Sequence, residues 1–361
     1  MQLGTHECMP PHGRDSGAPH GGARGGSLRA IPPRGGRTVA ITGACSFLGR
    51  NLIGVLEEDD TIARIVVLDI ATPRTAGRKT RSYRVDLTQP TAAARASEIL
   101  RAEQVDVLVH LAFLSSPTTA EGWAHELESV GTMHLLVAAR EAGVPRIVAA
   151  SQTMLYGPHR SNPNFLFEGA SLRGIEGCRF LSDKIDAEAQ LTRFASETGA
   201  RVTIVRLAPV LGPTVRSWLT RWLSRRFVPT LLGFDPLVQL LHEADAIAAL
   251  KTAIDVDVPG TFNVAGEGVL PITTIIKLAG RIGTPLPGPL LRRATALLWM
   301  SGMNEAPAPF VDYLRYLCVA DTTQARDALG FEPAYTTREA VLDFGGALRL
   351  REARLIREAI A

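Results

Sequence analysis

The chain of 361 residues is poor in cysteine and has no long apolar run. Its four cysteines, Cys8, Cys45, Cys178 and Cys318, are far apart and form no CxxC pair, which argues against a zinc site or a disulfide framework. We therefore expect no bound metal and a reducing, cytoplasmic location. Because no run of about 18 uncharged apolar residues occurs, we also expect no membrane span.

The net charge is small, at +3, and is concentrated at the N-terminus. Residues 1–37 hold five arginines against two acidic residues, so the remainder of the chain is neutral overall. A neutral body gives no sign of a nucleic-acid partner. Residues 1–36 are rich in Gly, Pro and Arg and have no apolar core like that of a signal peptide, so we expect a disordered tail there.

After this tail, short β-rich runs alternate with helical stretches. Apolar residues at spacings of three and four predict helices at 48–58, 91–103, 121–142 and 181–198. The alternation predicts an α/β Rossmann fold, in which a doubly wound parallel sheet carries helices on both faces. The strand-like runs are TVAIT (38–42), RIVVLD (64–69), SYRVD (82–86), VDVLVHL (105–111), RIVAAS (146–151) and VTIVRL (202–207).

Beyond residue 208 the pattern loosens into helices, Pro-rich turns and one late strand, TFNVAG (261–266). We predict a Rossmann domain at 37–207 and a smaller, mostly helical substrate lobe at 208–361, with Rossmann elements returning around 240–266. A lobe of this kind usually covers the carboxyl ends of the strands, where ligands of such sheets bind.

The stretch ITGACSFLGRNL lies where the first strand turns into the first helix. Gly43 permits the tight turn, and Gly49 lets the helix pack close to the strand. Ser46 stands where the usual pattern has its middle glycine, and its hydroxyl can donate to a diphosphate. Because the motif follows a strand, opens a helix and precedes Asp69 at the end of the second strand, it predicts dinucleotide binding.

The acidic residues after the second and third strands indicate which dinucleotide binds. Asp69 can accept hydrogen bonds from the adenosine ribose and repel a 2′-phosphate, which favours NAD over NADP. Arg74, five residues later, leaves NADP as the less favoured choice. Asp86 can meet the adenine amine, although an aspartate in a turn is an alternative reading.

These motifs resemble the extended short-chain dehydrogenase/reductase superfamily, in particular its NAD-dependent epimerase/dehydratase branch with UDP-glucose 4-epimerase-like proteins. The resemblance covers residues 38–345 and also rests on VHLAF (109–113), SDKIDAEAQL (182–191) and GTFNVAGEG (260–268). It implies a sugar-nucleotide-like or other hydroxyl or carbonyl substrate, and a homodimer that pairs helices 121–142 and 181–198. It implies cofactor contacts from Gly43, Cys45, Ser46, Phe47, Leu48, Gly49, Asp69, Asp86, Leu87, Leu111, Ala112, Phe113, Ala150, Lys184 and Leu207.

The resemblance implies a catalytic Tyr and Lys at Y-x-x-x-K spacing, in which the Tyr exchanges a proton and the Lys lowers its pKa. In this sequence Phe180 stands at the Tyr position, and Lys184 is kept. The family's Ser or Thr position holds Gln152, and its Asn position holds Glu128.

Other residues of this sequence are candidates for the missing groups. Ser151 and Thr153 flank Gln152 and are candidates for the hydroxyl. Glu128 and Tyr156 are candidates for a relocated acid or base. The chain is therefore either a divergent NAD-dependent enzyme or a catalytically inactive NAD(H)-binding sensor or partner-binding protein.

The substrate side departs from the family as well. Pro209 and Val238 stand where sugar-nucleotide members have an Asn and an Arg that hold the diphosphate. Four arginines in VRSWLTRWLSRRF are candidates for holding an acidic ligand, with a solvated helix face as the alternative reading. They are Arg216, Arg221, Arg225 and Arg226.

Overall fold

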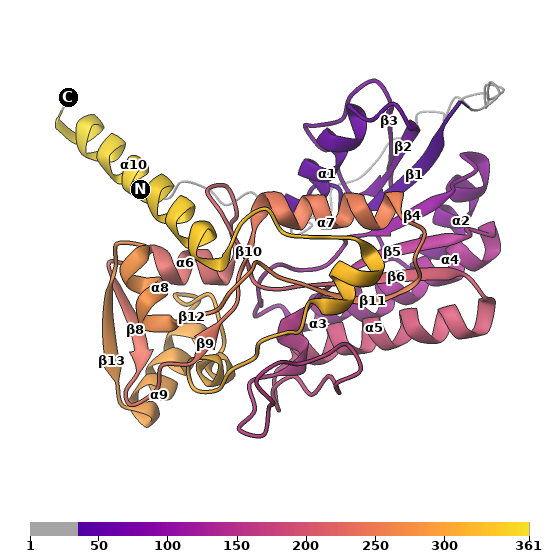
Figure 1. Cartoon of the computed structure of the whole chain (residues 1–361). Coiled ribbons are helices and arrows are strands. Elements are labelled where there is room, and N and C mark those ends of the chain that lie inside the picture. The colour runs from indigo at the N-terminus through magenta and orange to yellow at the C-terminus, as the bar shows by residue number, and fades with distance from the viewer. Residues whose placement is uncertain (1–34, 361) are drawn as a thin grey trace, which may run out of the picture.

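The computed structural model describes residues 35–360 (Figure 1). All but the last two residues of the tail expected at 1–36 lie outside this range. The described chain forms a large α/β lobe and a smaller lobe built from α6, α8, α9 and two-stranded sheets, which lie side by side in Figure 1. Within the described range, no helix is long and apolar enough to cross a membrane.

A parallel sheet of seven strands forms the centre of the larger lobe, in the order β11-β6-β5-β4-β1-β2-β3. The predicted α/β Rossmann fold is therefore confirmed. The order reverses between β1 and β4, the point at which ligands bind in such sheets. The strands are β1 (Arg37–Thr42), β2 (Ile62–Asp69), β3 (Thr80–Arg84), β4 (Val107–His110), β5 (Arg146–Gln152), β6 (Arg201–Leu207) and β11 (Gly260–Val264).

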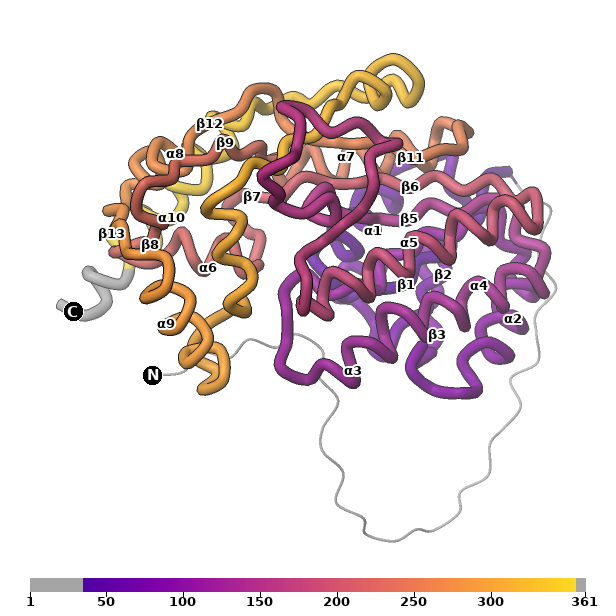
Figure 2. Tube along the Cα trace, turned by 90° about the horizontal axis from the view of Figure 1, so that it is seen from below, coloured from indigo at the N-terminus to yellow at the C-terminus, as the bar shows by residue number. Residues whose placement is uncertain are grey.

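Helices cover both faces of this sheet because successive strand side chains point to opposite sides. In β1, Val39 and Ile41 pack into a core with α1 (Phe47–Glu57) and α7 (Glu243–Asp255). Ala40 packs into the core of the other face. That face is covered by α2 (Ala92–Ala102), α4 (Gly131–Ala142) and α5 (Arg179–Thr198), which Figure 2 shows side by side.

The helix predicted at 121–142 is interrupted. It begins as α3 (Glu121–His125), widens into the π-helical segment η1 (Glu126–Val130) and continues as α4. Such π-helical turns are often found at functional sites. Glu128 lies in this segment, with its side chain turned into the protein interior at 1% exposure.

The C-terminal lobe has its own apolar core, in which Leu223, Ile276 and Phe344 are buried. Three pairs of short strands run through it, which the sequence did not predict because strands of two to five residues give too little alternation. The strands are β7 (Val210–Leu211), β8 (Phe227–Leu231), β9 (Leu237–Val238), β10 (Leu241–His242), β12 (Leu270–Pro271) and β13 (Ile282–Leu286). Its helices are α6 (Trp218–Ser224), α8 (Ile272–Leu278), α9 (Gly288–Met300) and α10 (Thr337–Ile360), with a shorter turn at η3 (Ala308–Leu314). Two further short turns belong to the larger lobe: η2 (Thr153–Tyr156) follows β5, and η4 (Ala325–Leu329) packs beside β11.

Candidate functional site

The turn between β1 and α1 requires its two glycines. Gly43 has φ +65°, and a Cβ there would lie 2.2 Å from the carbonyl oxygen of Leu111. A Cβ on Gly49 would lie 2.3 Å from the carbonyl oxygen of Gly43. Ser46 caps α1, and its Oγ accepts a hydrogen bond from the Gly49 amide at 3.0 Å. This close-packed helix start fits the diphosphate of a dinucleotide, which gains from the amides and dipole of a helix N-terminus.

Asp69 ends β2 beside this turn. Its Oδ2 accepts a hydrogen bond from the Cys45 amide at 3.0 Å, and its Oδ1 accepts one from the Ile70 amide at 2.7 Å. The carboxylate is half-buried, and each oxygen has a second lone pair for a ribose hydroxyl. Asp86 accepts hydrogen bonds from the amide and hydroxyl of Thr88, which is the turn geometry that the sequence left open.

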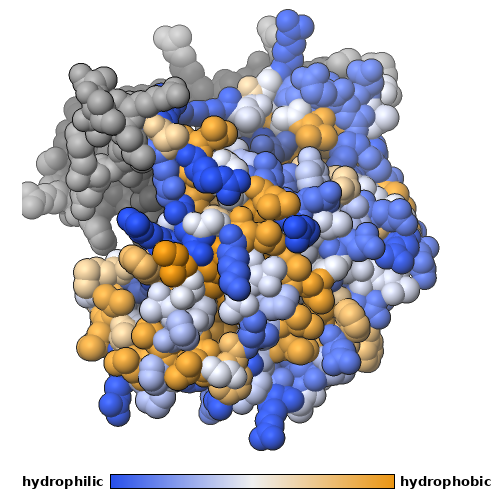
Figure 3. All heavy atoms as spheres, turned by 60° about the vertical axis from the view of Figure 1, so that its left-hand side comes forward, coloured by the Kyte–Doolittle hydropathy of each residue, from blue (hydrophilic) through white to orange (hydrophobic). Residues whose placement is uncertain are grey.

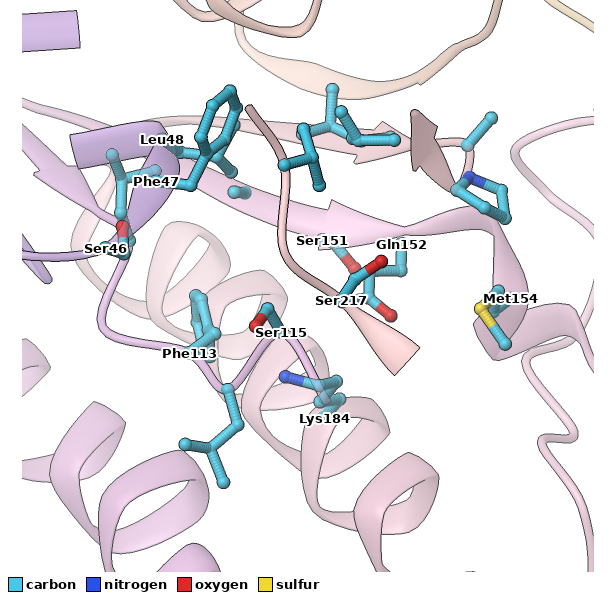
Figure 4. A pocket seen from close by; sticks show the side chains of 18 of the residues that line it. Ser46, Phe47, Leu48, Phe113, Ser115, Ser151, Gln152, Met154, Lys184 and Ser217 are labelled. Carbon is cyan, nitrogen blue, oxygen red and sulfur yellow. The ribbon is translucent and has the colours of Figure 1, made fainter. Parts of the chain in front are cut away.

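A cavity of about 1090 Å³, open to solvent, lies at the carboxyl ends of the central strands (Figure 4). We call it the first cavity. Leu87 is predicted to contact the cofactor, but its side chain is buried between the sheet and α2 and α4, outside the wall of this cavity. Gly43, Cys45, Gly49, Asp69, Asp86 and Ala112 are also not part of the wall. Those predicted cofactor residues that do line it are Ser46, Phe47, Leu48, Leu111, Phe113, Ala150, Lys184 and Leu207.

Lys184 and Glu128 form a buried ion pair at the edge of the first cavity. The Lys184 Nζ lies 2.8 Å from Glu128 Oε1, and their side chains are 6% and 1% exposed. The same oxygen accepts from the Leu114 amide at 2.7 Å, whereas Glu128 Oε2 has no hydrogen-bond partner among the described residues. Burial raises the pKa of Glu128. Burial, together with the Lys184 charge, lowers the pKa of His110 to about 3, so that His110 is neutral at pH 7.

Phe180 lies one helical turn before Lys184, where the resemblance places a tyrosine. The Lys184 Nζ is 4.7 Å from the centre of the Phe180 ring and 5.2 Å from that of Phe113. These are cation–π distances, and both rings help to hold the ammonium away from water. Phe180 itself packs with Met154 and Phe310 in a small apolar cluster. The lysine therefore has aromatic faces beside it in place of a phenol hydroxyl.

The candidate residues at the end of β5 lie in the walls of two different cavities. Gln152 and Ser151 line the first cavity (Figure 4), and the Ser151 hydroxyl donates to Glu188. Thr153 is buried and lies in the wall of a second cavity described below.

Tyr156, a candidate for a relocated acid or base, is fully buried away from the first cavity. Its hydroxyl donates to Asn263 at 2.8 Å and accepts from Arg206 at 2.6 Å. We correct this expectation, because a phenol with both hydrogen-bonding roles filled in the core cannot reach a ligand.

Sequence reasoning missed Glu188, which lines the first cavity one turn beyond Lys184 on α5. It forms a buried ion pair with Arg206 and also accepts the Ser151 hydrogen bond. The spacing of four between Lys184 and Glu188 places both on one helix face and is the signal that was available in the sequence.

The four candidate arginines have different surroundings. Arg216 is exposed at the wall of the first cavity and has no ion-pair partner among the described residues. Arg225 pairs with Glu305 at 2.8 Å, and Arg221 lies 4.0 Å from the same carboxylate. Arg226 stacks on a neighbouring phenylalanine ring. Only Arg216 is thus placed to meet an acidic ligand.

Comparison with known proteins places this geometry in a family. The sequence profile of the NAD dependent epimerase/dehydratase family matches residues 39–265. An uncharacterised protein of Mycobacterium tuberculosis is 34% identical over 321 residues, which cover 86% of this chain and 84% of that protein. A 3-diazoavenalumate denitrifying reductase of a Streptomyces species is 24% identical over 311 residues, or 82% of this chain and 96% of that protein.

Solved structures agree on the fold. A UDP-glucose 4-epimerase of Thermotoga maritima, solved with UDP-glucose, has a TM-score of 0.66 at 17% identity and covers 87% of this chain and 99% of its own. A UDP-glucose 4-epimerase of Thermus thermophilus in complex with NAD has a TM-score of 0.67 at 18% identity and covers 86% and 99%. At these identities the likeness shows the fold alone. Together with the matched profile, it means that the chain belongs to the NAD-dependent epimerase/dehydratase family.

Proposed function

We propose that this protein binds NAD(H) in the first cavity and has lost the tyrosine-dependent proton transfer of its family. The two glycines of the β1–α1 turn leave room for the diphosphate, and Asp69 can accept from the adenosine ribose. Lys184 lines the same cavity and can donate to the nicotinamide ribose. NAD bound to the related Thermus thermophilus epimerase supports this choice of cofactor.

The observation that carries the loss of proton transfer is the aromatic ring beside Lys184. A phenyl ring exchanges no proton, and Phe180 packs into apolar surroundings. The hydroxyl of Tyr313, in the same cluster, donates to the Met154 carbonyl oxygen at 2.6 Å. General acid–base catalysis by a positioned side chain typically contributes about 10²- to 10⁴-fold to rate. We therefore expect no interconversion of UDP-glucose and UDP-galactose above background.

The first test separates binding from proton transfer. Lys184→Ala alone would leave Glu128 buried and unpaired, at a cost of about 3–5 kcal/mol in stability, so it is made in a Glu128→Gln background. Relative to Glu128→Gln, the double variant should bind NAD about tenfold more weakly by calorimetry, because a charge-assisted hydrogen bond is lost. Phe180→Tyr should leave NAD affinity nearly unchanged. Unaltered affinity on loss of the ammonium would contradict the proposed role of Lys184.

A second candidate function is a reductase that draws its proton from the Lys184–Glu128 pair. It is favoured by the raised pKa of Glu128 and by the position of Lys184 in the cavity wall. NADH supplies a hydride when bound. Lys184 would give a proton to the substrate oxygen. Glu128 would return a proton to Lys184 in the protonated form that its raised pKa favours, rather than as the carboxylate of the ion pair. The Streptomyces relative, which is named a reductase, supports this candidate.

This candidate makes its own prediction about pH. Glu128 must hold its proton to donate it, so NADH oxidation by a ketone should fall as the pH rises through the raised pKa of Glu128. Glu128→Gln keeps the acceptor oxygen but cannot supply a proton, so it should lower the rate about 100-fold and remove this pH dependence. A rate that survives Glu128→Gln with the same pH profile would refute the candidate, and the measurement is NADH absorbance across a pH series.

A further inference from the structure

A second, larger cavity of about 1400 Å³, open to solvent like the first, lies between η2 and the C-terminal lobe, with α6 in its wall. It adjoins the first, because Met154, Pro209, Trp218 and Leu219 line both. Binding sites for small molecules are usually concave clefts with mainly hydrophobic and aromatic walls and few polar groups. The position of this cleft beside a cofactor site fits a bound small molecule.

The wall of this second cavity is mainly aliphatic and aromatic. The Trp218 and Phe310 rings meet edge to face with centroids 5.2 Å apart, and Phe310 and Tyr313 do the same at 5.6 Å. Phe180 continues this cluster toward Lys184, with its ring 6.2 Å from that of Phe310. The aliphatic part of the wall comes from Leu223, Leu237, Val238, Leu240, Ile272, Ile275, Leu286, Leu291, Leu298, Val311 and Leu314.

The two charged residues of this wall are paired with each other. Arg225 and Glu305 form an ion pair at 2.8 Å, and Arg225 also donates to Asn304 at 2.9 Å. The Tyr313 hydroxyl donates to the Met154 carbonyl oxygen at 2.6 Å. A diphosphate would enter this wall without an unpaired cation to meet it, and burying a charge without a partner is costly.

We propose that the second cavity binds an uncharged apolar molecule, aromatic or alicyclic, as the substrate side of this protein. An apolar molecule gains about 25 cal/mol for each Å² of its surface that leaves water, and flat rings suit the edge-to-face aromatic wall. Its hydroxyl or carbonyl end would point past Met154 and Trp218 toward Gln152 and Lys184. The label of substrate side rests on the NAD(H) site proposed above, whereas binding of an apolar molecule does not.

The probe is Nile red, a neutral dye whose fluorescence rises in apolar surroundings, titrated into the full chain. Ala294 lines the cavity from α9, so Ala294→Trp should fill part of it and weaken dye binding about tenfold or more. Val238 lines the cavity from strand β9, so Val238→Trp should fill another part of it and weaken dye binding to the same extent. Camphor, an apolar ketone, should displace the dye, and UDP-glucose should not.

A matched control tests whether the dye binds the outer face of α9 instead of the cavity. Figure 3, which brings the C-terminal lobe forward, shows apolar side chains on its outer face as well, and Leu297 and Met300 are 68% and 81% exposed. Leu297→Trp adds the same indole to this outer face and should change dye affinity by less than about twofold. A loss equal to that of Ala294→Trp would overturn the proposal, because the dye would then bind the outer surface.

Two further results decide the remaining alternatives. Unchanged dye affinity in both Ala294→Trp and Val238→Trp, or displacement of the dye by UDP-glucose, would overturn the apolar site. Circular dichroism on the same samples shows whether each variant is folded, and NAD calorimetry shows separately whether the NAD(H) proposal holds. If the dye results are as expected while NAD does not bind even to the unaltered chain, the apolar site stands and the proposed cofactor function fails.

Discussion

Lys184 carries its charge in a setting of one carboxylate and two aromatic rings. Its side chain is 6% exposed, and a buried ammonium is tolerated only where a counter-charge or strong acceptors compensate for lost water. Glu128 supplies that charge from 56 residues earlier in the chain. Glu128, which stands at the family's Asn position, thus allows Lys184 to remain buried, because its carboxylate balances the charge of the ammonium.

The carboxylate of Asp69 is a second single residue with a decisive effect, because it favours NAD over NADP. A 2′-phosphate would lie against its carboxylate, and two like charges about 4 Å apart near a protein surface repel by several kcal/mol at an effective dielectric constant of about 20. We expect calorimetry to show that NAD binds at least about tenfold more tightly than NADP. Asp69→Ala should reduce this difference in affinity between the two cofactors. Equal affinities for NAD and NADP in the unaltered chain would mean that the charge of Arg74 offsets the repulsion by Asp69. Arg74 is exposed and lies five residues after Asp69.

The α3–η1–α4 segment is an element whose helical character is predictable from the sequence but whose irregular geometry is not. The apolar spacing predicts one continuous helix across 121–142, and the segment is helical throughout but is interrupted by a π-helical stretch between α3 and α4. It does not predict that the turn falls at Glu126–Val130 and directs Glu128 toward Lys184. The identity of both residues was readable from the sequence, but their contact was not.

Helix α4 also bears on assembly. Met133 and Val137, one turn apart, are 47% and 42% exposed, and α4 and α5 lie side by side on one face of the molecule (Figure 2). We predict a homodimer that pairs these helices, as the family resemblance implies.

The dimer prediction is tested by sedimentation velocity. Met133→Asp with Val137→Asp should convert the dimer to a monomer, because two carboxylates would be desolvated in the interface. Val55→Asp is the matched control, since Val55 is also 42% exposed but lies on α1, on the other face of the sheet. A monomeric unaltered chain, or dissociation by Val55→Asp to the same extent, would show that the interface is elsewhere.

At the scale of the whole molecule, the fold follows from the sequence because the alternation of strands and helices is local. The Gly43–Gly49 turn and Asp69 are readable for the same reason. The cavities are not, because their walls join residues far apart in the chain: Met154, Trp218 and Phe310 meet only when both lobes have folded. Tyr156 shows the same limit: the sequence made it a candidate acid or base, but its side chain is buried against Leu166 and Ala320.

NAD binding and the apolar substrate side are tested together by a calorimetric titration in two stages on the full chain. NAD is added first until the sites are filled, and UDP-glucose is then added to the loaded protein. We predict a saturating NAD isotherm followed by no binding heat from UDP-glucose, because the wall of the second cavity is mainly apolar and Arg225, its cation among the described residues, is already paired. Arg216 in the wall of the first cavity is the unpaired cation that UDP-glucose could meet, and we expect it to give too little affinity alone. Saturable binding of UDP-glucose to the NAD-loaded protein, or the failure of NAD to bind at all, would contradict this prediction.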